Sequence, residues 1–173
     1  MKNMQIKTQR LLISIFDESM IESVHQNSLD EDTKRFVPDE VFETIEKAAG
    51  VVRFLMGQYD GSGPFVYPLI TLDGGENIGY VQAVPIDGGQ WEIGYKIASR
   101  HAGQGYATEA LSAFLPIIMG WLEITEIWGI SRADNGASCR VMEKLGFELK
   151  EQTVANYHGA QHQISKYLFS LPS

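Results

Sequence analysis

The chain has 173 residues, of which 44% are hydrophobic and 21% are charged. These proportions are typical of one globular domain and exclude fibrous and disordered classes of protein. Fourteen Lys and Arg residues against 22 Asp and Glu residues give a net charge of −8, so nucleic acid is not an expected partner. We expect a single domain over residues 1–173.

Neither a signal peptide nor a membrane-spanning helix is expected. The segment from Met1 to Lys7 has no apolar run, and the longest apolar stretch, from about Leu115 to Leu122, is far shorter than the roughly 18 residues that a span requires. We therefore expect a cytoplasmic protein with no membrane partner. One cysteine, Cys139, and four histidines without metal-ligand spacing predict neither a disulfide nor a metal site.

Alternating apolar residues predict a first strand over Gln9 to Phe16. Two helices are expected next, because Asp17 is a good N-cap and because apolar residues recur at three and four positions after Thr44. Three further strands are predicted at 65–72, 77–84 and 90–98. They are separated by Asp73-Gly74-Gly75 and Asp87-Gly88-Gly89, which are typical hairpin turns, and Pro68 favours an edge position for the first of the three.

The pattern changes after Ala98. We predict a glycine-rich loop, a helix from about Gly105 to Leu122, a strand near 126–132, a helix over 135–145 and two final strands. A strand–helix–strand crossover normally pairs its strands in parallel, so the sheet is expected to be mixed. Pro116 removes one helical hydrogen bond, and we expect a kink or an early stop there.

The glycine-rich loop has the composition of an anion-binding turn. Gly103 and Gly105 allow consecutive backbone amides to converge at the positive end of the following helix, which suits a diphosphate. The Gly-Lys-Ser/Thr signature of ATP-binding loops is missing, and Thr108 replaces the third glycine of the dinucleotide fingerprint. A loop that only turns the chain would also contain two glycines, so this segment alone leaves a purely structural role open.

Three motifs stand in a diagnostic order: Glu92-Ile93-Gly94-Tyr95, then Gly105-Tyr106-Ala107-Thr108-Glu109-Ala110, then Asn135-Gly136-Ala137-Ser138 with Glu143-Lys144-Leu145-Gly146-Phe147. Together with the opening Thr8-Gln9-Arg10-Leu11-Leu12-Ile13, they resemble the GNAT superfamily of acetyl-CoA-dependent N-acetyltransferases, most of all its ribosomal-protein N-terminal-alanine acetyltransferase branch. The resemblance implies an α/β fold with a mixed, mostly antiparallel sheet of about seven strands flanked by helices. The sheet is expected to splay between the strand ending at Ala98 and the strand near Trp128, where acetyl-CoA enters.

The resemblance also implies which residues bind the cofactor. The backbone of Ile97 and Ala98 is expected to pair with the pantetheine arm, and Arg100 and Asn135 are expected to contact the cofactor. The diphosphate is assigned to the amides of Ala102, Gly103, Gln104, Gly105, Tyr106 and Ala107. Two residues depart from the family pattern. Many relatives place a proton-donating tyrosine at the position of Met142, and Gln or Arg is common at the position of Ala102.

Two side chains are candidates for proton transfer. Glu92 is the predicted general base, alone or through a water, and the alternative is a strand glutamate that faces solvent or pairs with Lys96. Ser138 is the candidate that returns a proton to the thiolate, although serine is also common in a first helical turn. A backbone N–H near Ile97 or Ala98 is expected to stabilise the developing oxyanion.

The acceptor is expected to be a primary amine, either a small molecule or a peptide N-terminus, that attacks directly in a ternary complex. Leu29 to Phe42 and the His158-Gly159-Ala160-Gln161 turn are expected to bind it. The alternative functions are a non-catalytic CoA or acetyl-CoA sensor, which Met142 and Ala102 favour, and an unrelated binding module. A homodimer is compatible with this fold, but no pattern in the sequence identifies an interface.

Overall fold

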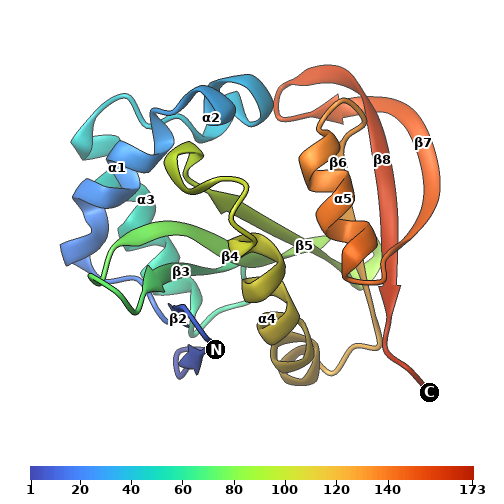
Figure 1. Cartoon of the computed structure of the whole chain (residues 1–173), viewed down its shortest axis with the longest axis horizontal. Helices are drawn as coiled ribbons and strands as arrows, with labels where there is room; N and C mark the ends of the chain where they lie inside the picture. The colour runs from blue at the N-terminus through green and yellow to red at the C-terminus, as the bar shows by residue number, and fades with distance from the viewer.

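The computed structural model describes residues 1–173 and is built on one mixed, mostly antiparallel sheet of eight strands, ordered β1-β2-β3-β4-β5-β6-β8-β7 (Figure 1). The strands are β1 (Ile6–Lys7), β2 (Leu11–Ile13), β3 (Phe65–Thr71), β4 (Asn77–Ile86), β5 (Gln90–Ile97), β6 (Glu126–Arg132), β7 (Glu148–Tyr157) and β8 (Ala160–Ser170). The α-helices are α1 (Ile21–Ser28), α2 (Glu31–Phe36), α3 (Ile45–Gln58), α4 (Tyr106–Leu122) and α5 (Gly136–Lys144). The predicted fold class is confirmed, with one strand more than expected. No helix combines the length and the apolar character that crossing a membrane requires.

The predicted helix starts are confirmed by their capping bonds. The side chains of Asp17, Thr44 and Asn135 each accept a hydrogen bond from a backbone N–H two or three residues further on. Such bonds satisfy donors that a helix start otherwise leaves free. Both predicted glycine turns also lie between antiparallel strands, with positive φ at all four of their glycines.

The segment from Leu29 to Phe42, which is expected to bind the acceptor, contains helix α2. Asp30 is its N-cap and accepts a hydrogen bond from the Thr33 amide at 2.9 Å. Asp is a favoured N-cap residue, and Glu31 and Asp32 add acidic residues to the first turn, so the sequence held the signals of a helix start.

The edge position predicted from Pro68 is wrong, because β3 lies between β2 and β4. The β2 ladder ends at the pair Ile13–Leu69, and the Ser14 amide then donates to the Pro68 carbonyl at 3.3 Å. The backbone groups of one residue in an antiparallel strand face the same neighbour, so the missing proline N–H faces the end of the short strand β2. An internal strand therefore tolerates the proline.

Of the two effects expected at Pro116, a kink or an early stop, the early stop is wrong, since α4 continues to Leu122. Leu115, Ile118 and Met119 are buried on either side of the proline. Their packing against the sheet holds the helix together despite the lost hydrogen bond.

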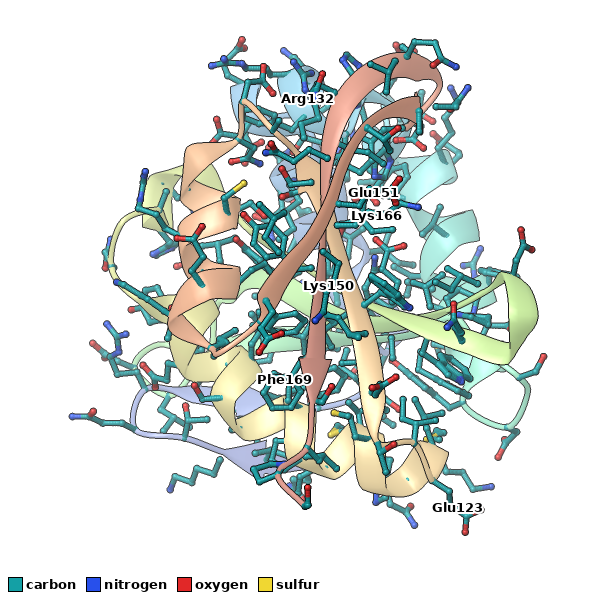
Figure 2. All side chains as sticks on the ribbon, turned by 90° about the vertical axis from the view of Figure 1, so that its right-hand side faces the viewer. Glu123, Arg132, Lys150, Glu151, Lys166 and Phe169 are labelled. Carbon is teal, nitrogen blue, oxygen red and sulfur yellow. The ribbon has the colours of Figure 1, made fainter.

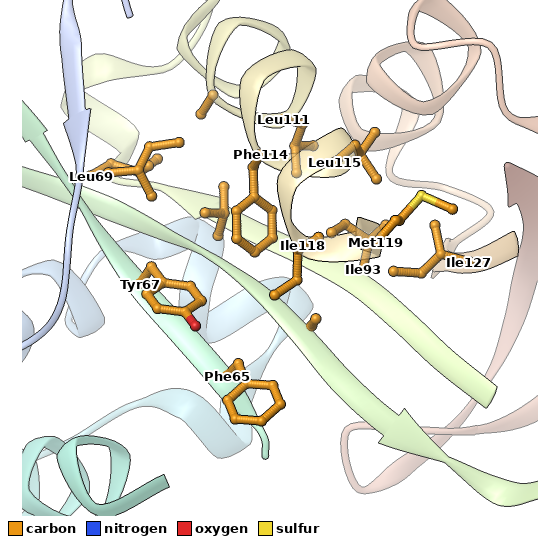
Figure 3. Packing of buried hydrophobic residues seen from close by; sticks show 14 of the residues in the cluster. Phe65, Tyr67, Leu69, Ile93, Leu111, Phe114, Leu115, Ile118, Met119 and Ile127 are labelled. Atoms are coloured by element: carbon orange, nitrogen blue, oxygen red, sulfur yellow. The ribbon is translucent and has the colours of Figure 1, made fainter. Parts of the chain in front are cut away.

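Strand β5 separates the two faces of the sheet by simple alternation. Ile93 is buried in the main core under α4, with Trp91, Tyr95 and Ile97 packed against that core, while Glu92 and Lys96 point to the opposite face. Figure 3 shows Ile93 beside Phe114, Ile118 and other core residues beneath the helix. Alternation along β5 therefore places the apolar side chains on the core side and the two charged side chains on the other.

Packing is much denser on one face than on the other. The core under α4 contains 21 buried residues, whereas the cluster between the sheet and the α1–α3 layer contains four: Phe16, Val52, Leu55 and Val66. The space left on that second face is a cavity, described below.

The pairing between β5 and β6 is unusually short. Only Glu92–Trp128 and Ile93–Gly129 are paired, in parallel, although both strands continue toward the glycine-rich loop and helix α5. Neighbouring strands normally stay paired along their common length, so this interruption leaves backbone groups of β5 without a partner.

Two glycine substitutions are predicted to change stability in opposite directions. Gly79 has φ +154°, and an added Cβ would lie 1.9 Å from the Lys96 carbonyl oxygen, so Gly79→Ala should destabilise the fold by about 3 kcal/mol or more. Gly50 lies inside α3 with open space around it, so Gly50→Ala should stabilise by about 0.5–1 kcal/mol. Urea unfolding of both variants tests the pair, and equal effects would contradict the structure.

Candidate active site

The glycine-rich loop presents free backbone amides at the start of α4. The amides of Ser99, His101 and Ala102 donate to acceptors within the protein, and the first intraprotein bond after them is from Glu109 N–H to the Gly105 carbonyl. The amides between Gly103 and Thr108 therefore have no acceptor in the chain. Of the amides predicted to bind the diphosphate, from Ala102 to Ala107, only that of Ala102 is occupied, because it donates to the Ser99 carbonyl at 3.1 Å. The remaining amides form a concave set of donors suited to an anion.

Side chains from distant elements hold the start of this loop in place. The Asp30 carboxylate accepts a hydrogen bond from the Ser99 amide at 2.9 Å. The same carboxylate accepts a hydrogen bond from the Thr33 amide of α2, so it ties α2 to the loop. Arg100 donates to Glu76 at 2.9 Å and to Asn27 at 2.9 Å. The Arg100 guanidinium is thus engaged away from the free amides and is a loop anchor rather than an available cation.

The far end of the loop is held by an Arg10–Glu109 pair. The Arg10 side chain donates to Glu109 at 2.7 Å, its backbone amide donates to the same carboxylate at 2.8 Å, and its guanidinium lies 4.1 Å from the centre of the Tyr106 ring. These bonds fix the first turn of α4 against the N-terminal segment. The role of Arg10 was not predicted from the sequence, because only the fold brings residues 10 and 109 together.

A cavity of about 440 Å³ lies between the loop, β5 and α5. Among the residues predicted for cofactor binding, those that line it are Ile97, Ala102, Gly103, Gly105, Tyr106, Ala107 and Asn135. Gln104 and Arg100 do not line it, and Ala98 lies in the cavity on the opposite side. Most of the predicted set is therefore gathered around one space.

Two further cations line this cavity. Arg140 and Lys144, one turn apart on α5, face it and take part in no ion pair, whereas His101 faces it but also contacts Glu76 at 3.2 Å. Neither Arg140 nor Lys144 was predicted from the sequence. The helix spacing of Arg140 and Lys144 from Gly136 could have indicated them.

A second cavity, of about 630 Å³, lies on the other face of the sheet under α1 and α3. The two cavities meet where β5 and β6 lose their pairing. The residues that line both are Glu40, Tyr80, Gln82, Glu92, Lys96, Ile130, Tyr157 and His158. A molecule in each cavity could therefore touch the other at this junction.

Glu92 is the titratable group at the centre of the junction. Burial raises the pKa of its carboxyl to about 7, while nearby Lys166 acts in the opposite direction. Lys166 Nζ lies 3.7 Å from the Glu151 carboxylate. Figure 2 labels both side chains on the β7–β8 pair. The predicted alternative, pairing of Glu92 with Lys96, is not found, since Lys96 donates to the Asn27 carbonyl at 2.7 Å and lies 3.8 Å from Asp30. A carboxyl with a pKa near neutrality can exchange protons under ordinary conditions.

Tyr157, which was not predicted, and Glu40, which belongs to the segment expected to bind the acceptor, line the junction together with Glu92. Burial, and then the charge of Glu92, raise the pKa of Tyr157, so this phenol stays protonated. Burial also raises the pKa of Glu40, whose carboxylate accepts a hydrogen bond from Tyr80. Neither residue lies in a recognisable motif, and only the fold brings them to the junction.

Ser138, the candidate proton donor, lies on the first turn of α5 and faces the smaller cavity. Its backbone amide is capped by Asn135 at 3.2 Å. Met142 is buried in the same wall and has no proton to donate. Cys139 contacts Ser131 at 3.5 Å, and no group of three His, Cys, Asp or Glu side chains could hold a metal ion anywhere in the chain.

The two segments expected to bind the acceptor meet across the larger cavity. The His158 ring lies 2.6 Å from Asp39, and Glu40, Phe42 and His158 all line the cavity. The β7–β8 turn and the α2–α3 connection thus form one rim.

Backbone donors also face the junction. The Ala98 amide donates to the Ile78 carbonyl at 2.8 Å, so this amide points toward β4. Alternation then directs the amides of Ile97 and Tyr95 to the opposite side, toward β6, where neither residue has a partner. Of the two amides considered for the oxyanion, that of Ala98 is occupied and that of Ile97 is available.

Comparison with known proteins identifies the family. A model described as an acetyltransferase (GNAT) domain matches residues 10–148. The chain belongs to the GNAT acetyltransferase family. It is 29% identical over 144 residues to the uncharacterized N-acetyltransferase YnaD of Bacillus subtilis (strain 168), with 83% of the chain and 82% of the relative covered. The family assignment makes the chain an acetyl-CoA-using N-acetyltransferase and rules out the unrelated binding module.

Solved structures agree with the fold. A GNAT-family acetyltransferase from Bacillus anthracis is 28% identical and superimposes with a TM-score of 0.83, covering 96% of this chain and 98% of the other. The ribosomal L7/L12 alpha-N-protein acetyltransferase RimL, in complex with coenzyme A, is 21% identical with a TM-score of 0.79, covering 95% and 96%. At 21% identity, the likeness to RimL supports the fold of this chain and nothing more.

The raised pKa of Glu92 predicts a specific pH dependence of stability. Between its ordinary value of 4.5 and about 7, the folded protein holds a proton that the unfolded chain releases, so the free energy of unfolding falls as pH rises through this window. The loss is up to about 3 kcal/mol and is complete above the folded pKa. Glu92→Gln should remove this decline in urea unfolding between pH 5 and 8, whereas the exposed Glu123→Gln should keep it. Equal slopes for all three proteins would show that Glu92 is not desolvated.

Proposed function

We propose that this GNAT enzyme transfers the acetyl group of acetyl-CoA to a primary amine by direct attack within a ternary complex. The observation that carries the proposal is the meeting of the two cavities at Glu92, beside unpaired amides of β5. Acetyl-CoA is assigned to the cavity of the glycine-rich loop, and the amine to the cavity under α1 and α3. The reacting groups then approach each other through the gap between β5 and β6.

The smaller cavity fits the charges of coenzyme A. The free amides from Gly103 to Thr108 at the start of α4 are assigned to the diphosphate, and Arg140 and Lys144 add positive charge from α5. Each charge-assisted N–H bond contributes roughly 1.5–3 kcal/mol, so several amides together can hold the diphosphate without a lysine in the loop. The unpaired edge of β5 at Tyr95 and Ile97 is available to the pantetheine amides.

The chemistry needs one proton removed and one returned. The amine nitrogen forms a bond to the acetyl carbon, the carbon–sulfur bond breaks, and sulfur leaves as a thiolate. Glu92 takes the proton released by the amine, and the Ile97 amide stabilises the carbonyl oxygen, a contribution worth roughly 3 kcal/mol. Ser138 on the cofactor side and Tyr157 at the junction are the hydroxyls placed to return a proton to sulfur.

Glu92→Gln should lower kcat at saturating amine by about 10²-fold, because the glutamine cannot accept a proton. In the unmodified enzyme, kcat should rise with pH and level off above about 7, where the carboxyl is ionised. Release of CoA thiol, followed across pH 5.5–9, measures both effects. An unchanged kcat and pH profile in the variant would remove Glu92 from the mechanism, and absence of thiol release with every amine would favour a CoA sensor.

The glycine-rich loop is tested by two matched substitutions. Gly103 and Gly88 have φ of +73° and +75°, and an added Cβ at either position would contact nothing within 4 Å. Gly103→Ala should weaken acetyl-CoA binding by about tenfold or more, because strain at this position misaligns the free amides. Gly88→Ala, in the β4–β5 turn, should leave affinity unchanged. Titration calorimetry with acetyl-CoA compares them, and equal affinities would place the diphosphate elsewhere.

A further inference from the structure

The larger cavity is strongly asymmetric along its length. Its end under the helices is apolar, and Glu40 and Glu92 lie at the junction with the smaller cavity. The apolar end is lined by Phe16, Val24, Val51, Leu55 and Val66. Three of these side chains, Phe16, Leu55 and Val66, also belong to the four-residue buried cluster on this face, and Val24 and Val51 pack against it. The cavity therefore extends from a charged junction to an apolar wall.

The polar side chains that α1 and the start of β4 contribute to this cavity, those of Asn27, Ser28 and Asn77, are already hydrogen-bonded within the protein. Asn27 donates to the Asn77 carbonyl at 2.9 Å, and its carbonyl oxygen accepts a bond from Arg100. Asn77 donates to Ser23 at 3.0 Å, and Ser28 donates to the His25 carbonyl at 2.8 Å. A polar substituent on the acceptor would lose its water here without gaining new partners, which is unfavourable.

Carboxyl groups that can accept hydrogen bonds at the junction complement the amine itself. Glu92 and Glu40 both face that space, whereas the amino group of Lys96 is directed to the Asn27 carbonyl and Asp30. The amine nitrogen thus has its place near Glu92, and the remainder of the acceptor extends toward Val51 and Leu55. The group attached to the amine nitrogen therefore contacts the apolar end of the cavity, which selects it.

We propose that the acceptor is a primary amine bearing a branched aliphatic or aromatic group close to the nitrogen. This inference rests on the proposed function and specifies its substrate class. A cavity of about 630 Å³ accommodates a group much larger than a methyl. Each methylene bound in an apolar pocket changes kcat/KM by at least about tenfold. The size of the acceptor's apolar group should therefore contribute most to substrate selection.

Two sources can supply this chemistry: a free arylalkyl or branched alkyl amine, and the first residue of a peptide. Thiol release with acetyl-CoA should be measured for phenethylamine and leucinamide, with glycinamide and ethanolamine as small or polar references. A short peptide amide beginning with Leu, compared with one beginning with Gly, forms the peptide arm. The arm with the higher kcat/KM identifies the source.

The expected result is that phenethylamine or leucinamide exceeds glycinamide by at least tenfold in kcat/KM, or that the Leu peptide exceeds the Gly peptide by the same factor. Equal or better turnover of glycinamide, ethanolamine and the Gly peptide would overturn the inference and leave the proposed function intact.

A matched pair of substitutions on α3 locates the selectivity. Val51 lines the apolar end, whereas Met56 is exposed on the same helix and does not line the cavity. Val51→Phe should reduce the ratio of kcat/KM for phenethylamine to that for glycinamide by at least about tenfold, and Met56→Phe should leave the ratio unchanged. A ratio unaffected by Val51→Phe would place the apolar group outside this cavity.

Binding without turnover separates this inference from the proposed function. Ligand-observed NMR can follow phenethylamine with the enzyme in the presence of CoA. If no amine releases thiol but phenethylamine binds and Val51→Phe weakens its binding, the proposed function fails and the apolar site stands. If glycinamide is acetylated and phenethylamine does not bind, the apolar site fails and the proposed function stands.

Discussion

The parting of β5 and β6 after Ile93 is the constraint on which the site depends. A sheet that stayed paired would satisfy its own amides and would separate its two faces completely. Here the amides of Tyr95 and Ile97 are left for another partner, and the spaces on the two faces become continuous. The lost ladder bonds are a cost to stability, and it is offset by the dense core that surrounds Ile93 under α4.

Unequal packing of the two sheet faces follows from the same strand. One side of β5 is joined to a core of 21 residues, whereas the other presents Glu92 and Lys96 to a cavity because α1 and α3 bury only a small cluster. Burial in that cavity raises the pKa of Glu92 to about 7, so the packing of the helices determines the chemistry of a strand residue. The fold thus uses alternation along one strand to build both its stability and its reactive group.

The glycine-rich loop obtains its shape from bonds that lie outside it. Asp30 fixes its first amide, Glu76 holds Arg100, and Glu109 with Arg10 fixes the turn where α4 begins. Each of these bonds joins segments that are far apart in sequence. The glycines allow the conformation, but the remote carboxylates select it and leave the intervening amides free.

The sequence alone determined the elements whose causes are local. Capping by Asp17, Thr44 and Asn135, the glycine turns and the face alternation of β5 depend on neighbours within a few residues. The motifs at Glu92, Gly105 and Asn135 also sufficed to indicate the family. Tertiary structure decided what depends on distant partners: the internal position of β3 despite Pro68, the continuation of α4 past Pro116, and the assembly of Tyr157, Glu40 and Arg140 around the cavities. Burial and pairing between remote segments have no signature in a local pattern, because their free energies arise only when the chain has folded.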